Sequence, residues 1–272
     1  SQRGQKINKS PIQGISETLK IEYRTPSSLK NNNEEYNYLK ELEADIAIVV
    51  AYGQIIPKEY LSLVKKGFIN IHASLLPKWR GAAPIQRSIM SLEKETGISI
   101  MKIGERLDTG PICDSYKIEI MADDNSETIA AKLSALAAEK ILDNIDQILE
   151  DKIEFKEQNH KEASYAPKIE KTEGQIEWNE TAENIIGKIN GLYPSPGAFF
   201  TYNGERYKIL KANLALGNGE IGEVLDNYLE ISCGNKKSIK VLEIQRQGKR
   251  PQNIGEFMLG SQIKKGSKLS NV

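Results

Sequence analysis

Hydrophobic residues change their spacing along the chain, and the first half alternates between two periods. A nearly all-apolar run such as ADIAIVVA is typical of a strand buried on both faces of a parallel sheet. The expected strands of this half cover residues 44–51, 68–72, 97–103 and 112–120. Helical spacing is found between them, over residues 34–43, 58–65 and 84–92. This alternation predicts an α/β domain with a largely parallel sheet.

The clearest helix follows residue 124. Its apolar residues recur every three to five positions and so share one side of a helix: Ile129, Leu133, Leu136, Ile141, Ile145 and Ile148. Asp124 and Glu127 have the spacing of a capping box at its start.

Near residue 170 the pattern changes to short strands with turn signals, after one more helix near residues 181–192. Asn203-Gly204 separates two apolar runs and is the strongest short-range signal for a β-hairpin. About five short strands favour a small, OB-like barrel. The chain is therefore expected to divide into two domains, over residues 1–168 and 172–272.

Composition narrows the class of protein. The 272 residues carry 37 Lys plus Arg and 37 Asp plus Glu. The zero net charge argues against a strongly basic nucleic-acid-binding protein but leaves room for a local basic patch. Cys113 and Cys233 match no metal-binding spacing, and with no visible signal peptide they predict a reduced, cytoplasmic protein without a metal. No apolar run approaches the roughly 18 residues of a membrane span.

One stretch, residues 68–84, concentrates the candidate chemistry. Asn70 and His72 are two positions apart on an expected strand and so project from the same face. Asp108 follows a neighbouring strand, and α/β sheets build sites at the carboxyl ends of strands. An amide can stabilise an oxyanion while an imidazole moves a proton, so the three residues fit acyl transfer without a metal or a nucleophilic Ser or Cys. His72 and Asp108 each also have a structural alternative, since a lone His is more often structural and Asp is common in turns.

A turn follows His72, because Pro77 has no N–H to give to a strand ladder. The turn is expected either to line a ligand pocket with backbone groups or to be an ordinary turn. Its residues are Ser74, Leu75, Leu76 and Pro77.

Local positive charge is expected at three places in this neutral chain: the N-terminal loop, the segment beside Trp79, and residues 246–250. Aromatic and cationic side chains together suit a nucleic acid or another anionic substrate. The alternative is a solvated run of surface charges. The cations concerned are Arg3, Lys6, Arg80, Lys249 and Arg250. The second histidine, His160, lies in a polar stretch and is expected to be solvated.

Several short motifs occur in a fixed order along the chain. NIHASLLP at residues 70–77 is followed directly by KWRGAAPIQ, and AYGQIIP, TGISIM, LDTG and YAPKI lie before or after it. Together they resemble the methionyl-tRNA formyltransferase family, and the resemblance covers essentially the whole chain. It implies a Rossmann-like formyltransferase domain with a parallel-rich sheet, followed by a C-terminal OB-like β-barrel domain that binds tRNA.

The resemblance also implies a reaction: transfer of a formyl group from 10-formyltetrahydrofolate to the methionine α-amino group of initiator methionyl-tRNA, which supports translation initiation. The family's catalytic Asn, His and Asp fall on Asn70, His72 and Asp108. Its folate-site Ser-Leu-Leu-Pro falls on residues 74–77, and its tRNA-contacting loop resembles residues 1–11, with Arg3 in an Arg-Gly pair. A monomer with folate and tRNA as partners is expected.

The family begins with a strand and a helix upstream of that loop, whereas this sequence starts inside the loop, so a first strand and helix are expected to be missing. Two alternative functions stay open. A folate-dependent formyltransferase acting on a nucleotide-sugar amine would share the same catalytic residues. A non-catalytic RNA-binding fragment would use the barrel and the basic loop alone. Trp79, the AAPIQ run and the barrel favour the tRNA substrate.

Overall fold

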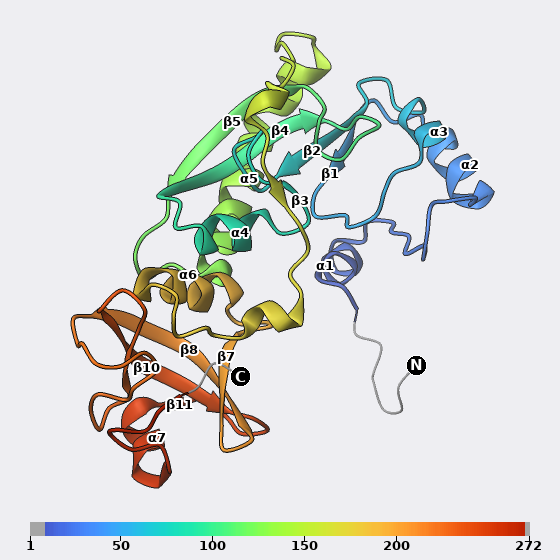
Figure 1. Cartoon of the computed structure of the whole chain (residues 1–272). Coiled ribbons are helices and arrows are strands. Elements are labelled where there is room, and N and C mark those ends of the chain that lie inside the picture. Colours follow the sequence, from blue (N-terminus) through green and yellow to red (C-terminus); the bar gives the residue numbers. More distant parts are fainter. Residues whose placement is uncertain (1–8, 270–272) are drawn as a thin grey trace.

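The computed structural model describes residues 9–269 and shows two packed bodies (Figure 1). The first contains a four-stranded sheet with helices around it, and the second contains a curled, antiparallel sheet of five strands. The expected fold class is confirmed: an α/β Rossmann-like domain is followed by a second domain, in which the expected OB-like β-barrel is a curled, antiparallel half-barrel sheet. The expected residues Arg3 and Lys6 lie outside the described residues.

The first sheet has the strand order β1-β2-β4-β5. Its strands are β1 (Ala47–Val49), β2 (Phe68–His72), β4 (Glu95–Lys102) and β5 (Ile112–Glu119). β1 and β2 pair in parallel, whereas β2 with β4 and β4 with β5 pair antiparallel. The sheet is therefore mixed rather than largely parallel. The connection between β4 and β5, residues 103–111, is too short for the crossover that a parallel neighbour needs.

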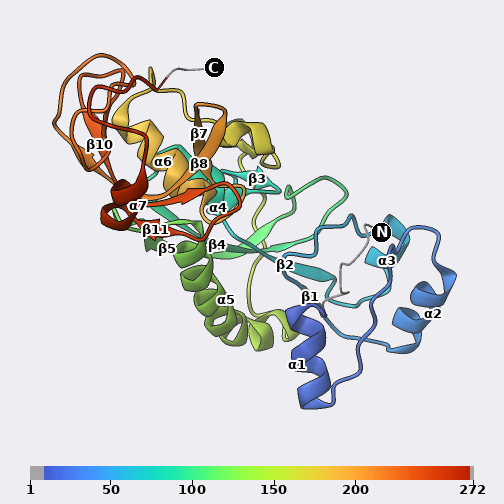
Figure 2. The same cartoon turned by 90° about the horizontal axis from the view of Figure 1, so that it is seen from below.

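One long helix lies against the sheet (Figure 2). The long helix α5 (Ser126–Leu149) packs its Ile129 and Leu133 against Ile71 of β2 and Ile98 of β4. A capping box is present at its start, but Asn125 and Thr128 form it, one position after the expected pair. Asp124 instead accepts hydrogen bonds from the Met121 N–H and from Lys132.

The remaining helices of the first body are short. They are α2 (Asn33–Glu41), α3 (Lys58–Leu61) and α4 (Pro84–Met90), all within or close to the expected segments. A further helix, α1 (Pro11–Leu19), was not expected from the apolar pattern. Its signals are nevertheless in the sequence, because Ser10 caps the Gln13 N–H and Pro11 occupies the first turn.

The second body is built around the buried side chains of Trp178 and Phe200. Its strands are β7 (Ala198–Tyr202), β8 (Glu205–Ala215), β9 (Glu230–Ser232), β10 (Ser238–Arg246) and β11 (Gln252–Asn253), and its helices are α6 (Ala182–Leu192) and α7 (Ile254–Gly260). The expected hairpin joins β7 to β8, and both Asn203 (φ 50°) and Gly204 (φ 76°) adopt the left-handed conformation that a two-residue turn of this kind requires.

Several contacts join the bodies, among them a hydrogen bond from the Ser126 hydroxyl to the Gly191 carbonyl oxygen and the Arg87–Glu173 ion pair. The short strands β3 (Arg80–Gly81) and β6 (Tyr165–Ala166) pair in parallel, which ties the segment after β2 to the connection between the bodies. Helix α6 packs on α4 through two glycines, Gly187 and Gly191. The hydrophobic cores themselves are separate, with one made of residues from 176 onward and the others of residues up to 155.

Candidate active site

Strand β2 presents the two side chains on which the candidate site depends. Asn70 and His72 project from one face because side chains alternate along a strand. His72 is 7% exposed and Asn70 is half-buried. Within the described residues the Asn70 carboxamide has no hydrogen-bonding partner, so its N–H₂ group is available to an incoming oxygen.

The imidazole of His72 is oriented by a backbone carbonyl. Its Nε2 lies 3.0 Å from the carbonyl oxygen of Trp79. A carbonyl oxygen only accepts, so Nε2 must carry the proton and Nδ1 holds a lone pair in the neutral ring. Nδ1 faces the carboxylate of Asp108 at 3.7 Å. This distance is too long for a direct hydrogen bond, and a proton taken up at Nδ1 would create an ion pair there.

Asp108 lies on the loop between β4 and β5, in the left-handed region at φ 50°. Its Oδ2 accepts a hydrogen bond of 2.8 Å from the Gly81 N–H. Its own carbonyl oxygen accepts one of 2.9 Å from Gln158. The structure therefore brings His72 and Asp108 together across 36 positions of sequence, and Asn70 lies two residues before His72 on the same strand face. The carboxylate and the backbone carbonyl of Asp108 are thus both hydrogen-bonded to residues outside its loop.

The turn after β2 is held by its own hydrogen bonds. The Ser74 hydroxyl donates to the Lys78 carbonyl oxygen at 2.6 Å, and the Ser99 hydroxyl donates to the Ser74 carbonyl oxygen at 2.8 Å. Ser99 also accepts from the Leu76 N–H at 3.0 Å. The Ser74 side chain is fully buried, so a ligand at this turn would contact its backbone and the partly exposed Leu75 and Pro77.

Arg80 corrects one expectation. It was expected to contact tRNA, but it is only 2% exposed. Its guanidinium donates to Gln158 Oε1 at 3.1 and 2.5 Å and contacts His160 Nδ1 at 3.0 Å. A buried guanidinium committed to protein partners is not available to a phosphate. His160 itself is exposed, as expected, but one ring nitrogen is engaged with Arg80.

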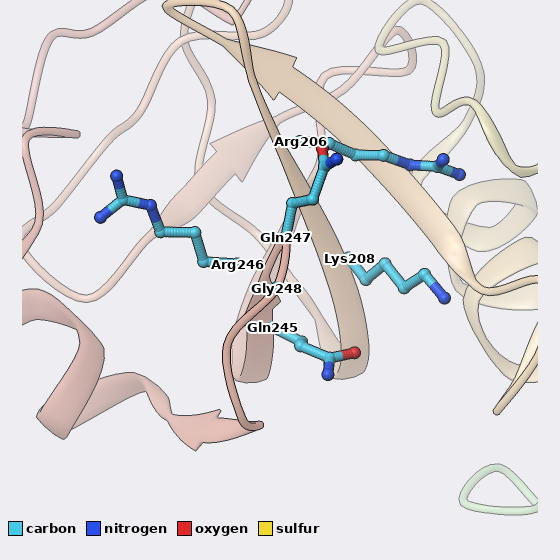
Figure 3. A pocket seen from close by; sticks show the side chains of 6 residues that line it. All are labelled: Arg206, Lys208, Gln245, Arg246, Gln247 and Gly248. Carbon is cyan, nitrogen blue, oxygen red and sulfur yellow. The ribbon is translucent and has the colours of Figure 1, made fainter. Parts of the chain in front are cut away.

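A basic surface lies on the second body. Arg206, Lys208 and the end of β10 line a shallow hollow there, and Figure 3 shows Arg246 extending away from Arg206 and Lys208. Arg246 pairs with Glu205, and Arg206 lies over the Phe199 ring at 3.4 Å. The expected residues Lys249 and Arg250 follow in the exposed turn after β10. Several cations thus gather near this turn.

A second hollow lies where the bodies meet. It begins at Ala82, directly after Gly81, and is lined in addition by Ala83, Gln86, Lys168, Ile169, Lys171, Ser195 and Pro196. The sequence pattern assigns no role to its two lysines, although Lys168 belongs to the YAPKI motif. Gln158 was also missed, and nothing in its polar surroundings in the sequence distinguishes it.

Ion pairing and burial shift the pKa values of three further side chains. Arg87 of α4 forms a bidentate pair with Glu173 and holds the pKa of that carboxyl below its usual value of 4.5. Burial raises the pKa of the Cys113 thiol to about 11 and that of Cys233 to about 12, so neither is a thiolate near neutral pH.

Residues 9–269 lack two features. They contain no group of three or more His, Cys, Asp or Glu side chains that could hold a metal ion. No helix among these residues is long and apolar enough to cross a membrane.

Comparison with known proteins gives concordant matches. The family model for formyl transferase matches residues 2–145, and the model for the C-terminal domain of formyl transferase matches residues 168–262. A methionyl-tRNA formyltransferase of Pelagibacter ubique is 71% identical over 272 residues, which is all of this chain and 88% of that protein. One from Jannaschia sp. is 40% identical over 267 residues, covering 98% of this chain and 87% of that protein.

Solved structures share the fold at lower identity. HypX from Aquifex aeolicus in complex with tetrahydrofolic acid has a TM-score of 0.64 at 17% identity, over 84% of this chain and 41% of that one. WlaRD, a sugar 3N-formyl transferase, also has a TM-score of 0.64, at 23% identity, over 78% and 77% of the two chains. The matches of both halves, and the identity over the full length of the chain, show that it belongs to the formyltransferase family.

Proposed function

We propose that this protein transfers a formyl group from 10-formyltetrahydrofolate to the α-amino group of initiator methionyl-tRNA. The observation that carries the proposal is the His72–Asp108 pair, at 3.7 Å, with Asn70 on the same face of β2 as His72. The acceptor is taken from the relatives, since the protein that is 71% identical is a methionyl-tRNA formyltransferase. A folate-derived donor fits the family.

The geometry supports a division of roles. The attack of a neutral amine on the formyl carbon places negative charge on the formyl oxygen, and the unengaged Asn70 N–H₂ group is suited to donate to it. His72 Nδ1, with its lone pair facing Asp108, is suited to receive the proton that the amine loses. The resulting imidazolium is stabilised by the Asp108 carboxylate. The same proton is then available to N10 of the departing folate, so the proton balance closes within the site.

Binding follows the same plan. We assign the folate to the turn formed by Ser74, Leu75, Leu76 and Pro77. We assign the exposed cations Lys249 and Arg250, together with Arg3 and Lys6 of the N-terminal segment, to the phosphates of the tRNA. Residues 1–168 then act as the catalytic domain and residues 172–272 as the tRNA-binding domain. We further propose that the protein acts in the cytoplasm, as a monomer, in translation initiation.

The proposal is tested by a choice of acceptors. Purified protein is incubated with 10-formyltetrahydrofolate and either methionyl initiator tRNA or a nucleotide-linked amino sugar, and N-formylated product is measured. We expect formyl-methionyl-tRNA from the first acceptor and no product from the second. Formylation of the amino sugar alone would support the other branch of the family and contradict the assigned acceptor. Binding of tRNA without formylation of either acceptor would contradict the catalytic assignment.

A further inference from the structure

Gln158 is a buried residue whose side-chain amide forms hydrogen bonds through both its oxygen and its nitrogen. It is 7% exposed. Its Oε1 accepts from both Arg80 Nε and Arg80 Nη2. Its Nε2 donates to the Asp108 carbonyl oxygen at 2.9 Å and to the Gly110 carbonyl oxygen at 2.8 Å. Two acceptor contacts on one side and two donor contacts on the other fix the orientation of the amide.

The segments that Gln158 joins are those that aim the catalytic groups. Arg80 lies between Trp79, whose carbonyl oxygen orients His72, and Gly81, whose N–H donates to Asp108 Oδ2. On the other side, the Asp108 loop receives both donor contacts. Gln158 therefore connects the backbone that holds the imidazole to the backbone that holds the carboxylate.

The backbone conformation of the Asp108 loop requires restraint of the kind that the Gln158 hydrogen bonds supply. Asp108 has a positive φ of 50°, a conformation that a non-glycine residue keeps only when its surroundings impose it. At the same loop Gly110 approaches β4 so closely that an added Cβ would lie 1.9 Å from the Lys102 carbonyl oxygen. The side chain of Gln158 contacts the loop on either side of Thr109, at Asp108 and at Gly110.

We propose that Gln158 is a positioning residue for the formyl-transfer reaction and that, together with Arg80, it fixes Asp108 opposite His72. This inference rests on the proposed function for the role of the His72–Asp108 pair. It assigns no contact with either substrate to Gln158. Loss of the Gln158 hydrogen bonds lets the carboxylate turn away from Nδ1, and proton transfer slows while substrate binding stays the same.

The substitution Gln158→Glu separates the hydrogen bonds to Arg80 from those to the Asp108 loop. A glutamate still accepts from Arg80, and the charge strengthens that contact. It cannot donate to the two loop carbonyls. Gln147→Glu is the matched control, because Gln147 on α5 also donates to a backbone carbonyl, that of Asp143 at 3.0 Å, but is exposed. Gln158→Asn serves as a second variant that keeps both chemical groups on a shorter stem.

Kinetics give the first readout. We expect Gln158→Glu to lower kcat by about 10²-fold, since a misplacement of about 1 Å at a reacting group has that effect. KM for both substrates should stay within about threefold, because no interaction common to ground state and transition state is removed. The kcat of Gln158→Asn should lie between those of Gln158→Glu and the wild type, and the kcat of Gln147→Glu should equal that of the wild type. A rise in KM with unchanged kcat, or a wild-type kcat in Gln158→Glu, would overturn the inference.

A second readout needs no substrate and so separates this inference from the proposed function. The chain has only two histidines, so the ¹⁵N resonances of the His72 ring can be resolved and assigned with a His160→Asn variant. We expect the Nδ1 shift of His72 to move in Gln158→Glu and in Gln158→Asn but not in Gln147→Glu. Identical His72 spectra in all three would overturn the positioning role, whichever acceptor the wild-type enzyme formylates. If Gln158→Glu does not fold, the comparison of Gln158→Asn with Gln147→Glu decides alone.

Discussion

Arg80 places a positive charge in the interior of the junction between β3 and β6, and the hydrogen-bond partners of its guanidinium, Gln158 and His160, carry no carboxylate. A surface cation and a buried cation look alike in a sequence, because Lys78-Trp79-Arg80 contains no periodic signal that separates the two. Arg80 therefore changes from a candidate tRNA contact to part of the structure around Asp108.

We predict that Arg80→Met lowers the free energy of unfolding by about 1–3 kcal/mol, because it leaves the buried Gln158 Oε1 without its donors. Formyl transfer should slow, while tRNA affinity should stay close to that of the wild type. Chemical denaturation and a filter-binding assay with tRNA check the two parts. The control is Lys78→Met at the neighbouring exposed position. If Arg80→Met leaves stability unchanged and weakens tRNA binding, Arg80 contacts tRNA and the structural role is contradicted.

Some of the site could be predicted from residue spacing and some could not. The period of a strand placed Asn70 and His72 on one face, and the position of Asp108 after a strand placed it at the edge of the sheet. Gln158 could not be found in this way. Its function in the fold depends on two carbonyl oxygens that lie 48 and 50 positions away, and no local pattern encodes such contacts.

Helices α4 and α6 show what periodicity predicts about elements and what it omits. Both helices were expected close to their observed bounds. Their packing on each other was not, because it depends on the missing side chains of Gly187 and Gly191. A Cβ at Gly191 would lie 2.6 Å from Met90 Cγ and 3.0 Å from the Gln86 carbonyl oxygen. The spacing of hydrophobic residues also does not specify the direction of a strand, so it did not predict the antiparallel pairing of β2 with β4.

We predict that Gly191→Ala destabilises the protein by about 1–3 kcal/mol, since the added methyl group forces α4 and α6 apart. Thermal unfolding measures the effect. Gly14→Ala in α1 is the matched control, because a Cβ there meets nothing within 4 Å. The control should be neutral or stabilising by about 0.5–1 kcal/mol, the usual gain of Ala over Gly inside a helix. Equal stability of Gly191→Ala and the wild type would show that the helices are not in close contact.

The whole molecule combines zero net charge with a local basic surface on its second body. Such a distribution suits a protein that binds an anionic polymer through a limited face and does not bind every nucleic acid strongly. Lys168 and Lys171 line the hollow where the two bodies meet.

We predict that the double variant Lys249→Ala/Arg250→Ala weakens binding of methionyl-tRNA and lowers the dependence of log K on log salt by about 1–2, because one to two phosphate contacts are lost. Its rate at saturating tRNA should be unchanged, since neither residue lies at the catalytic pair. Binding titrations at several salt concentrations provide the measurement, with Lys152→Ala as the control for removal of an exposed cation elsewhere. A salt slope equal to that of the wild type would exclude both residues from the interface.

The central claim is that Asn70 stabilises the oxyanion of a formyl transfer to methionyl-tRNA, and a single-turnover rate tests it most directly. Asn70→Asp has nearly the same shape but cannot donate, so formylation of methionyl initiator tRNA should slow by about 10²–10³-fold. The unfolding transition should stay near that of the wild type, because the Asn70 carboxamide makes no hydrogen bond within residues 9–269. A single-turnover rate equal to the wild-type rate would contradict the account.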